Sequence, residues 1–209
     1  MRTISKGPEP SDLTAWKHKN PRKSYDELDP IIRRIIRQCA LEEQFYLCAY
    51  CCQGIEDIDG CHNEHLEAQK LNPAHTLDFS NIVASCNTPN QCGNAHQSQH
   101  LPLTPLMAEC ETELRFKVSG RVEGVTDRAI DTIQVLNLGD HEKNNRALIE
   151  KRKQLSNALL WTNGINPDEG LEDEELLEML IDDLSQPQQN QMEPFMPVVI
   201  NILRSWLQS

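Results

Sequence analysis

CAYCCQGIEDIDGCHNEHLEAQKLNPAHTLDFSNIVASCNTPNQCGNAHQSQH, residues 48–100, holds six of the chain's eight cysteines, five of its seven histidines and six asparagines. No long amphipathic helix pattern runs through this stretch, so it is expected to bury little apolar surface. Something else must then hold it together. A bound metal is the first candidate, because disulfides are rare in the cytosol.

Two pairs of cysteines predict a zinc site. Cys48 and Cys51 form a Cys-x2-Cys knuckle, which can offer two thiolates from a single turn. Cys86 and Cys92 supply a second pair, with five residues between them, which is looser than usual. Four thiolates close the coordination of a structural zinc ion, and its binding energy would fold the segment. The alternative is that these thiols pack as small buried hydrophobes.

The other four cysteines are not the first candidates for zinc ligands. Cys52 and Cys61 lie close enough in sequence to substitute as ligands. Cys39 falls on the apolar face of a predicted helix and is expected to pack there. Cys110 has no partner in view.

Between and after the cysteine pairs lie residues suited to hydrolytic chemistry. Glu64 can bind a divalent ion through oxygen, and His65 beside it can deprotonate water, since imidazole titrates near neutrality. Asn81 could fix the imidazole by a hydrogen bond, and His96 could complete the ligands of the ion. Taken singly, each has the ordinary alternative of a solvated residue in a polar loop.

The order CAYC, EHL, DFSNIVASC and CGNAH resembles that of the HNH endonucleases, whose ββα-metal core is often framed by a four-cysteine zinc site. The resemblance is closer to the HNH proteins of retron and Septu anti-phage systems, which are encoded beside an SMC/ABC-like ATPase. It covers about residues 1–155. Further matching segments are MRTISKGPEP, SYDEL, EEQFYLCAYC, PLTPL and IQVLNL.

The resemblance implies a role for each candidate. His65 would be the general base, oriented by Asn81, while Glu64 and His96 would hold a catalytic Mg or Mn ion. Two departures leave alternatives open. The chain has no proline in the residues that follow His65, where the family often has one. Related members often carry lysine where His96 stands, so the rivals for the last ligand are Asn94, His100 and His62.

The sequence predicts a mainly helical α+β fold in which an HNH ββα-metal core with its zinc site is flanked by helices. Its parts are an N-terminal arm and helix (1–46), the core (47–104) and a mostly helical C-terminal region with an acidic tail (105–209). Residues 1–23 are expected to form at most an extended arm. A helix should begin near Asp29 or at a capping box formed by Ser24 and Glu27, and should end near Glu43. Residues 113–122 should form a hairpin.

Three apolar stripes predict helices in the C-terminal region. The first holds Leu148, Arg152, Leu155 and Leu159; the second Leu177, Leu180, Ile181 and Leu184; the third Phe195, Val198, Val199, Ile202, Leu203 and Trp206. Pro187–Gln191 reads as a polar linker between the last two. The acidic run is expected to be a solvated helix face.

The charge is uneven along the chain, which has a net charge of -12. After Lys153 the only basic residue is Arg204. Most of the negative charge therefore lies in the C-terminal part, and the net charge does not exclude nucleic-acid binding by the N-terminal part. The N-terminal part offers no strong basic patch, however. No apolar run suggests a membrane span or a secretory signal, so a cytoplasmic protein is expected.

Two functions are consistent with these patterns. The first is a metal-dependent endonuclease acting on DNA or RNA with the partner ATPase; the reverse transcriptase and msDNA of a retron are further candidate partners. No Walker A sequence is present, so ATPase activity would come from the partner. The second is a non-catalytic zinc-knuckle adaptor that binds the ATPase or nucleic acid. Glu64 and His65 distinguish the two, because a pure zinc module has no use for them.

Overall fold

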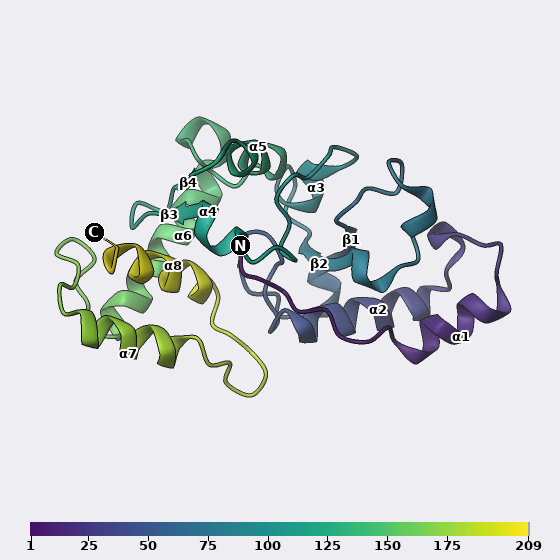
Figure 1. Ribbon diagram of the computed structural model, residues 1–209, viewed down its shortest axis with the longest axis horizontal. Helices are drawn as coiled ribbons and strands as arrows, with labels where there is room; N and C mark the ends of the chain where they lie inside the picture. The colour runs from purple at the N-terminus through teal and green to yellow at the C-terminus, as the bar shows by residue number, and fades with distance from the viewer. Residues whose placement is uncertain (209) are drawn as a thin grey trace.

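The computed structural model describes residues 1–208 as a mixed α+β fold with two small antiparallel sheets (Figure 1). The strands are β1 (Cys61–His65), β2 (Ile82–Cys86), β3 (Leu114–Phe116) and β4 (Val122–Gly124). The helices are α1 (Ser11–Lys19), α2 (Pro30–Glu43), α3 (Gly93–His96), α4 (Cys110–Glu113), α5 (Asp127–Leu136), α6 (Glu142–Thr162), α7 (Glu174–Leu184) and α8 (Met196–Trp206).

The first sheet carries most of the candidate site residues. β1 and β2 pair antiparallel, with Cys61 opposite Cys86 and His65 opposite Ile82. α2 packs against this sheet, and the short helix α3 follows β2 in the chain (Figure 1). Two strands are thus followed by a helix of four residues.

The stretch 48–100 buries far more apolar surface than its composition suggests, so that expectation was wrong. All five residues of β2 are buried, and Tyr50 has no exposed surface. One continuous cluster of buried side chains runs from Met1 to Leu203 and includes six cysteines of this stretch. The reason is that helices from both flanks cover the segment, which sequence periodicity within it cannot reveal.

The N-terminal region is a second correction, since residues 11–19 form α1 rather than an extended arm. Leu13 and Trp16 are buried against α2, and the Trp16 indole N–H donates to Asp29 at 3.0 Å. Asp29 therefore holds α1 and does not cap α2 with its side chain. Ser24 and Glu27 close a separate 3-10 turn, Tyr25–Glu27.

The helix expected to end near Glu43 is confirmed as α2. The expected hairpin is also confirmed, with its second strand at Val122–Gly124. The stripe expected on α6 is partly wrong, because Leu155 is 38% exposed. The buried face of α6 is formed by Leu148, Ile149, Arg152, Ser156 and Leu160. This buried face is rotated about the helix axis relative to the expected stripe, and the charged side chain of Arg152 lies at its centre.

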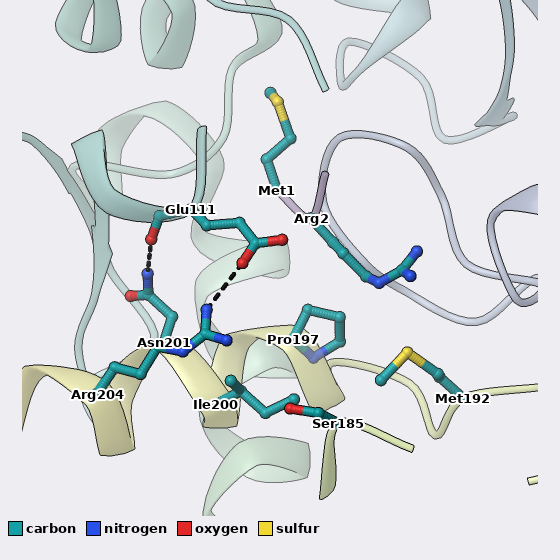
Figure 2. A pocket seen from close by; sticks show the side chains of 9 residues that line it. All are labelled: Met1, Arg2, Glu111, Ser185, Met192, Pro197, Ile200, Asn201 and Arg204. Carbon is teal, nitrogen blue, oxygen red and sulfur yellow. Dashed lines mark hydrogen bonds and ion pairs between the residues drawn. The ribbon is translucent and has the colours of Figure 1, made fainter. Parts of the chain in front are cut away.

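α8 joins the C-terminal region to both the second sheet and the start of the chain. Asn201 donates to the Glu111 carbonyl at 2.7 Å and accepts from the Phe116 amide, while Arg204 pairs with the Glu111 carboxylate at 2.8 Å. Figure 2 shows Glu111, Asn201 and Arg204 beside a cavity of about 190 Å³ that Met1 and Arg2 also line. None of the candidate metal or catalytic residues lines this cavity. Among residues 1–208, no helix has the length and apolar character needed to cross a membrane.

Candidate functional site

The four predicted zinc ligands come together in the fold. The sulfur atoms of Cys48, Cys51, Cys86 and Cys92 all lie within 4.8 Å of one another, and all four residues are buried. A tetrahedral zinc ion with bonds of about 2.3 Å to sulfur requires sulfur separations of ~3.8 Å. The cluster can therefore bind a metal such as zinc with little movement. In the part of the chain that the structure describes, no other set of three or more His, Cys, Asp and Glu ligand atoms converges in this way.

The backbone around the cysteines presents them to a common point. The knuckle turns back on itself, with the Cys52 amide donating to the Cys48 carbonyl at 3.1 Å. Cys86 ends β2, and its amide donates to the Cys48 sulfur at 3.4 Å. Cys92 has a φ of 54°, a left-handed conformation that costs a non-glycine residue energy and is common at functional sites.

A buried glutamine completes the shell of this cluster. Gln91 is 3% exposed, and its side-chain amide donates to Cys51 at 3.6 Å and to Cys86 at 3.7 Å. N–H donors of this kind stabilise thiolates, which are the form that binds zinc. Burial raises the pKa of Cys51 and Cys92 well above the usual range, while hydrogen bonds from the other three thiols lower the pKa of Cys86.

Beside the thiols, Glu64 joins two histidines. Its Oε1 lies 2.6 Å from Nδ1 of His96, and its Oε2 lies 3.3 Å from Nε2 of His62. His62 and Glu64 share one face of β1 because side chains alternate along a strand, and His96 reaches them from α3. The structure thus brings Glu64 and His96 together as predicted and adds His62, which the sequence left as a rival.

Both ring nitrogens of each imidazole face a hydrogen-bond acceptor, so the bonds to an ionised Glu64 are made by protonated rings and no single neutral tautomer is selected. The Nε2–H of His96 donates to the Gln99 carbonyl at 2.8 Å, so Nδ1 is the nitrogen that faces Glu64. The Nδ1–H of His62 donates to the Asn87 side-chain oxygen at 2.9 Å, so Nε2 faces Glu64. Such outer hydrogen bonds are typical of histidines that bind metals. Burial would raise the pKa of Glu64, but the hydrogen bonds to His62 and His96 lower it overall.

Two further groups pack closely around Glu64. A Cβ atom at Gly93 would lie 2.5 Å from His62 Nε2 and 2.6 Å from Glu64 Oε2, so only glycine fits there. The Tyr50 hydroxyl is fully buried and has no hydrogen-bond partner. Burial and the nearby Glu64 carboxylate raise the pKa of Tyr50 well above its usual value. Carboxylate oxygen and imidazole nitrogen are donor types that divalent cations take, and here they are hydrogen-bonded to one another.

His65 faces the other side of β1. Its ring packs edge-on against Tyr25, with centroids 4.6 Å apart, and its Nε2–H donates to the Thr76 carbonyl at 2.9 Å. This bond leaves Nδ1 as the proton acceptor of the ring. Burial lowers the pKa of His65, which favours the neutral form. The side chain is 6% exposed.

Asn81 does not orient His65 by the direct hydrogen bond that was expected, and this is a correction. Its Oδ1 accepts from the Glu67 amide at 2.8 Å, and its Nδ2 donates to the carbonyls of Glu67 and His75. It therefore ties together the two ends of the loop between β1 and β2. The carbonyl of His75, which accepts from Asn81, belongs to the residue before Thr76, whose carbonyl accepts from His65.

The rivals for the last ligand position are separated by the structure. Asn94 donates to the Thr88 carbonyl at 3.1 Å. His100 is exposed and lines a cavity of about 520 Å³ together with Leu66, Asn81 and Leu106. Of the candidate ligands, His62 and His96 hydrogen-bond Glu64.

Several residues of the site were missed by sequence reasoning. Tyr50, Gln91 and Gly93 each adjoin a predicted ligand in the chain, and that adjacency was the one available signal. The other four cysteines, Cys52 included, stay outside the cluster. Cys61 donates to the Ile58 carbonyl, Cys110 lies 3.8 Å from the Thr3 hydroxyl, and Cys39 on α2 packs against the buried side chains between α1 and α2, as expected. Comparison of the chain with known protein families and with functionally characterised proteins found no match.

Proposed function

We propose that this chain is a metal-dependent endonuclease of the HNH type, which hydrolyses phosphodiester bonds of nucleic acid. The observation that carries the proposal is the Glu64 carboxylate held between His62 and His96, with His65 next in the strand. The partner ATPase and the anti-phage role rest on the sequence resemblance alone.

The proposed chemistry divides between two faces of β1. Glu64, His96 and His62 would hold Mg or Mn, which supplies positive charge to the phosphate as negative charge develops in the reaction. His65, with Nε2–H fixed on the Thr76 carbonyl, accepts a proton from water at Nδ1. Asn81 keeps the loop that carries Thr76 in place. His65 ends β1, so a substrate strand would pass the end of the sheet to meet both groups.

The zinc cluster supports this arrangement structurally. Cys86 ends β2, and the carbonyl of Cys92 accepts the amide of His96 at 2.9 Å. A metal on the four thiols would therefore fix both ends of the segment that delivers His96 to Glu64. Structural and catalytic metals would occupy separate, neighbouring positions.

The non-catalytic adaptor is the second candidate, and one observation favours it. The four thiols form a ready metal site, whereas Glu64 already hydrogen-bonds both imidazoles and His65 is almost completely buried. A binding module would need the thiols and none of these groups.

Cleavage assays distinguish the two candidates. Purified protein with its zinc in place is incubated with plasmid DNA and with RNA, in the presence of Mg, Mn or neither, and Glu64→Gln is compared with Glu56→Gln on the exposed surface. The endonuclease predicts metal-dependent cleavage of one of the substrates that Glu64→Gln abolishes and Glu56→Gln retains. Cleavage that is independent of both the added metal and Glu64, or no cleavage even with the partner ATPase, contradicts the proposal.

A further inference from the structure

Arg152 is the largest side chain in the protein that is completely buried. Its Nη1 donates to the Gly120 carbonyl at 2.7 Å and its Nη2 to the Leu138 carbonyl at 2.8 Å. Its Nε has no hydrogen-bond partner, and the Phe116 ring lies 4.9 Å from the guanidinium carbon. Within residues 1–208 no carboxylate is paired with it. A buried guanidinium with carbonyl partners alone lacks a compensating negative charge.

The acidic groups within electrostatic reach of Arg152 are thiols. Burial lowers the pKa of Arg152 to about 10, and the charges of Cys51, Cys52 and Cys92 oppose that change. Two of these three residues belong to the four-cysteine cluster. The geometry agrees: the Cys92 amide donates to the Leu136 carbonyl and Arg152 donates to the Leu138 carbonyl two residues on, so both pack against one buried segment, where charges are weakly screened.

A line of hydrogen bonds also connects the cluster to the helix that carries Arg152. Gln91 donates to Cys51 and Cys86, and its side-chain oxygen accepts from Asn145 at 2.9 Å. Asn145 has non-helical dihedral angles and accepts the Leu148 amide at 3.1 Å, so it caps the straight part of α6. In addition, the Cys92 amide donates to the Leu136 carbonyl at 2.8 Å.

A metal-loaded cluster would supply the negative charge that the buried Arg152 guanidinium lacks. Four thiolates around one divalent zinc ion carry a net charge of about −2, whereas four protonated thiols carry none. We propose that Arg152 is the counter-ion of the metal-loaded Cys48–Cys51–Cys86–Cys92 cluster, so that metal binding and the packing of α6 stabilise each other. The proposal rests on metal binding by the thiols and is independent of nuclease activity.

The test measures zinc affinity of the full chain by competition with a chromophoric chelator. Arg152→Met should weaken zinc binding by about tenfold or more, as expected for losing one nearby charge in a poorly screened site. Arg146→Met is the matched control, because Arg146 lies on the same helix and is exposed. It should leave the affinity unchanged.

Arg152→Lys separates charge from hydrogen bonding. Lysine keeps the positive charge but cannot reproduce the fork that meets two carbonyls. Zinc affinity within about twofold of the natural protein, with Arg152→Met clearly weaker, supports the counter-ion role. If Arg152→Lys loses as much affinity as Arg152→Met, or if both variants fail to fold, the carbonyl contacts explain Arg152 and the proposal is wrong. Unchanged affinity in Arg152→Met contradicts it as well.

Discussion

Glu64 and His96 are 32 residues apart in the chain, yet their side chains meet at 2.6 Å in the interior. The path between them passes through β2 and then through Cys86 and Cys92, two members of the thiol cluster. The position of His96 thus depends on how those two cysteines are held. The cluster and the histidine–glutamate group are therefore one structural unit, and perturbing the first should disturb the second.

Zinc should be required for folding. Elemental analysis of purified protein should give about one zinc per chain, the stoichiometry of a single four-thiolate site. Cys48→Ser, or removal of the metal by a strong chelator, should lower the temperature of thermal unfolding, because the metal contributes folding energy. Cys39→Ser is the control, since Cys39 lies outside the cluster. A metal-free protein that unfolds at the same temperature as the purified one would refute this prediction.

His65→Gln should remove catalysis without removing the fold. The glutamine amide can still donate to the Thr76 carbonyl, but it cannot accept a proton as imidazole does. Loss of a general base lowers the rate by ~10²–10⁴. The measurement is the single-turnover cleavage rate at saturating Mg or Mn, with zinc content and circular dichroism as checks. His18→Gln, on the exposed side of α1, should cleave normally. Normal cleavage by His65→Gln would remove His65 from the mechanism.

The sequence was most informative where metal chemistry restricts the residues. Cysteine spacing predicted the thiol cluster, because the ligands of one ion must converge whatever the surrounding fold. The resemblance named Glu64 and His96, whose side chains lie together in the structure. The tertiary contacts could not be predicted from the sequence. α1 was missed because its buried face consists of only Leu13 and Trp16, and its stability comes from packing on α2. Arg152 was placed on an apolar stripe, and nothing local in the sequence indicates that its charge is buried.

Gly93→Ala should disrupt the Glu64 group specifically. The added methyl would approach His62 Nε2 and Glu64 Oε2 to 2.5 and 2.6 Å, so both side chains must move. We expect weaker binding of Mn, measured by calorimetry on the zinc-loaded protein, and slower cleavage. Gly60→Ala is the matched control, because its Cβ would meet only Ile55 at an ordinary 3.9 Å. Equal Mn affinity in the two variants would show that Glu64 does not bind the ion.

Tyr50→Phe should leave the zinc-loaded, Mn-free protein as stable as before or more stable. The Tyr50 hydroxyl is buried without a hydrogen-bond partner, so its removal relieves a desolvation cost and breaks no hydrogen bond. Tyr46→Phe provides the contrast, since the Tyr46 hydroxyl accepts from Gln38 at 3.0 Å and such a bond contributes about 0.5–1.5 kcal/mol. Denaturant unfolding measures both. If Tyr50→Phe is the more destabilised variant, the hydroxyl has a partner such as ordered water. If Tyr50→Phe also binds Mn more weakly, the partner of the hydroxyl is bound at Glu64.

Truncation after Trp161 should unfold the protein, because α8 is part of the core. Phe195, Val198, Val199 and Leu203 have no exposed surface, and Asn201 bonds the backbone at Glu111, Leu114 and Phe116. Burial of each such side chain contributes about 1.5–3 kcal/mol, so losing four removes a large part of a typical stability of about 5–15 kcal/mol. The truncated chain should aggregate or lose its cooperative thermal transition.

As the control, three exposed glutamates of α7 are changed together to glutamine: Glu174, Glu175 and Glu178. That variant should fold normally, and its affinity for nucleic acid at low salt measures whether the acidic face repels phosphate. A truncated chain that stays soluble and melts cooperatively would show that residues 1–161 fold on their own.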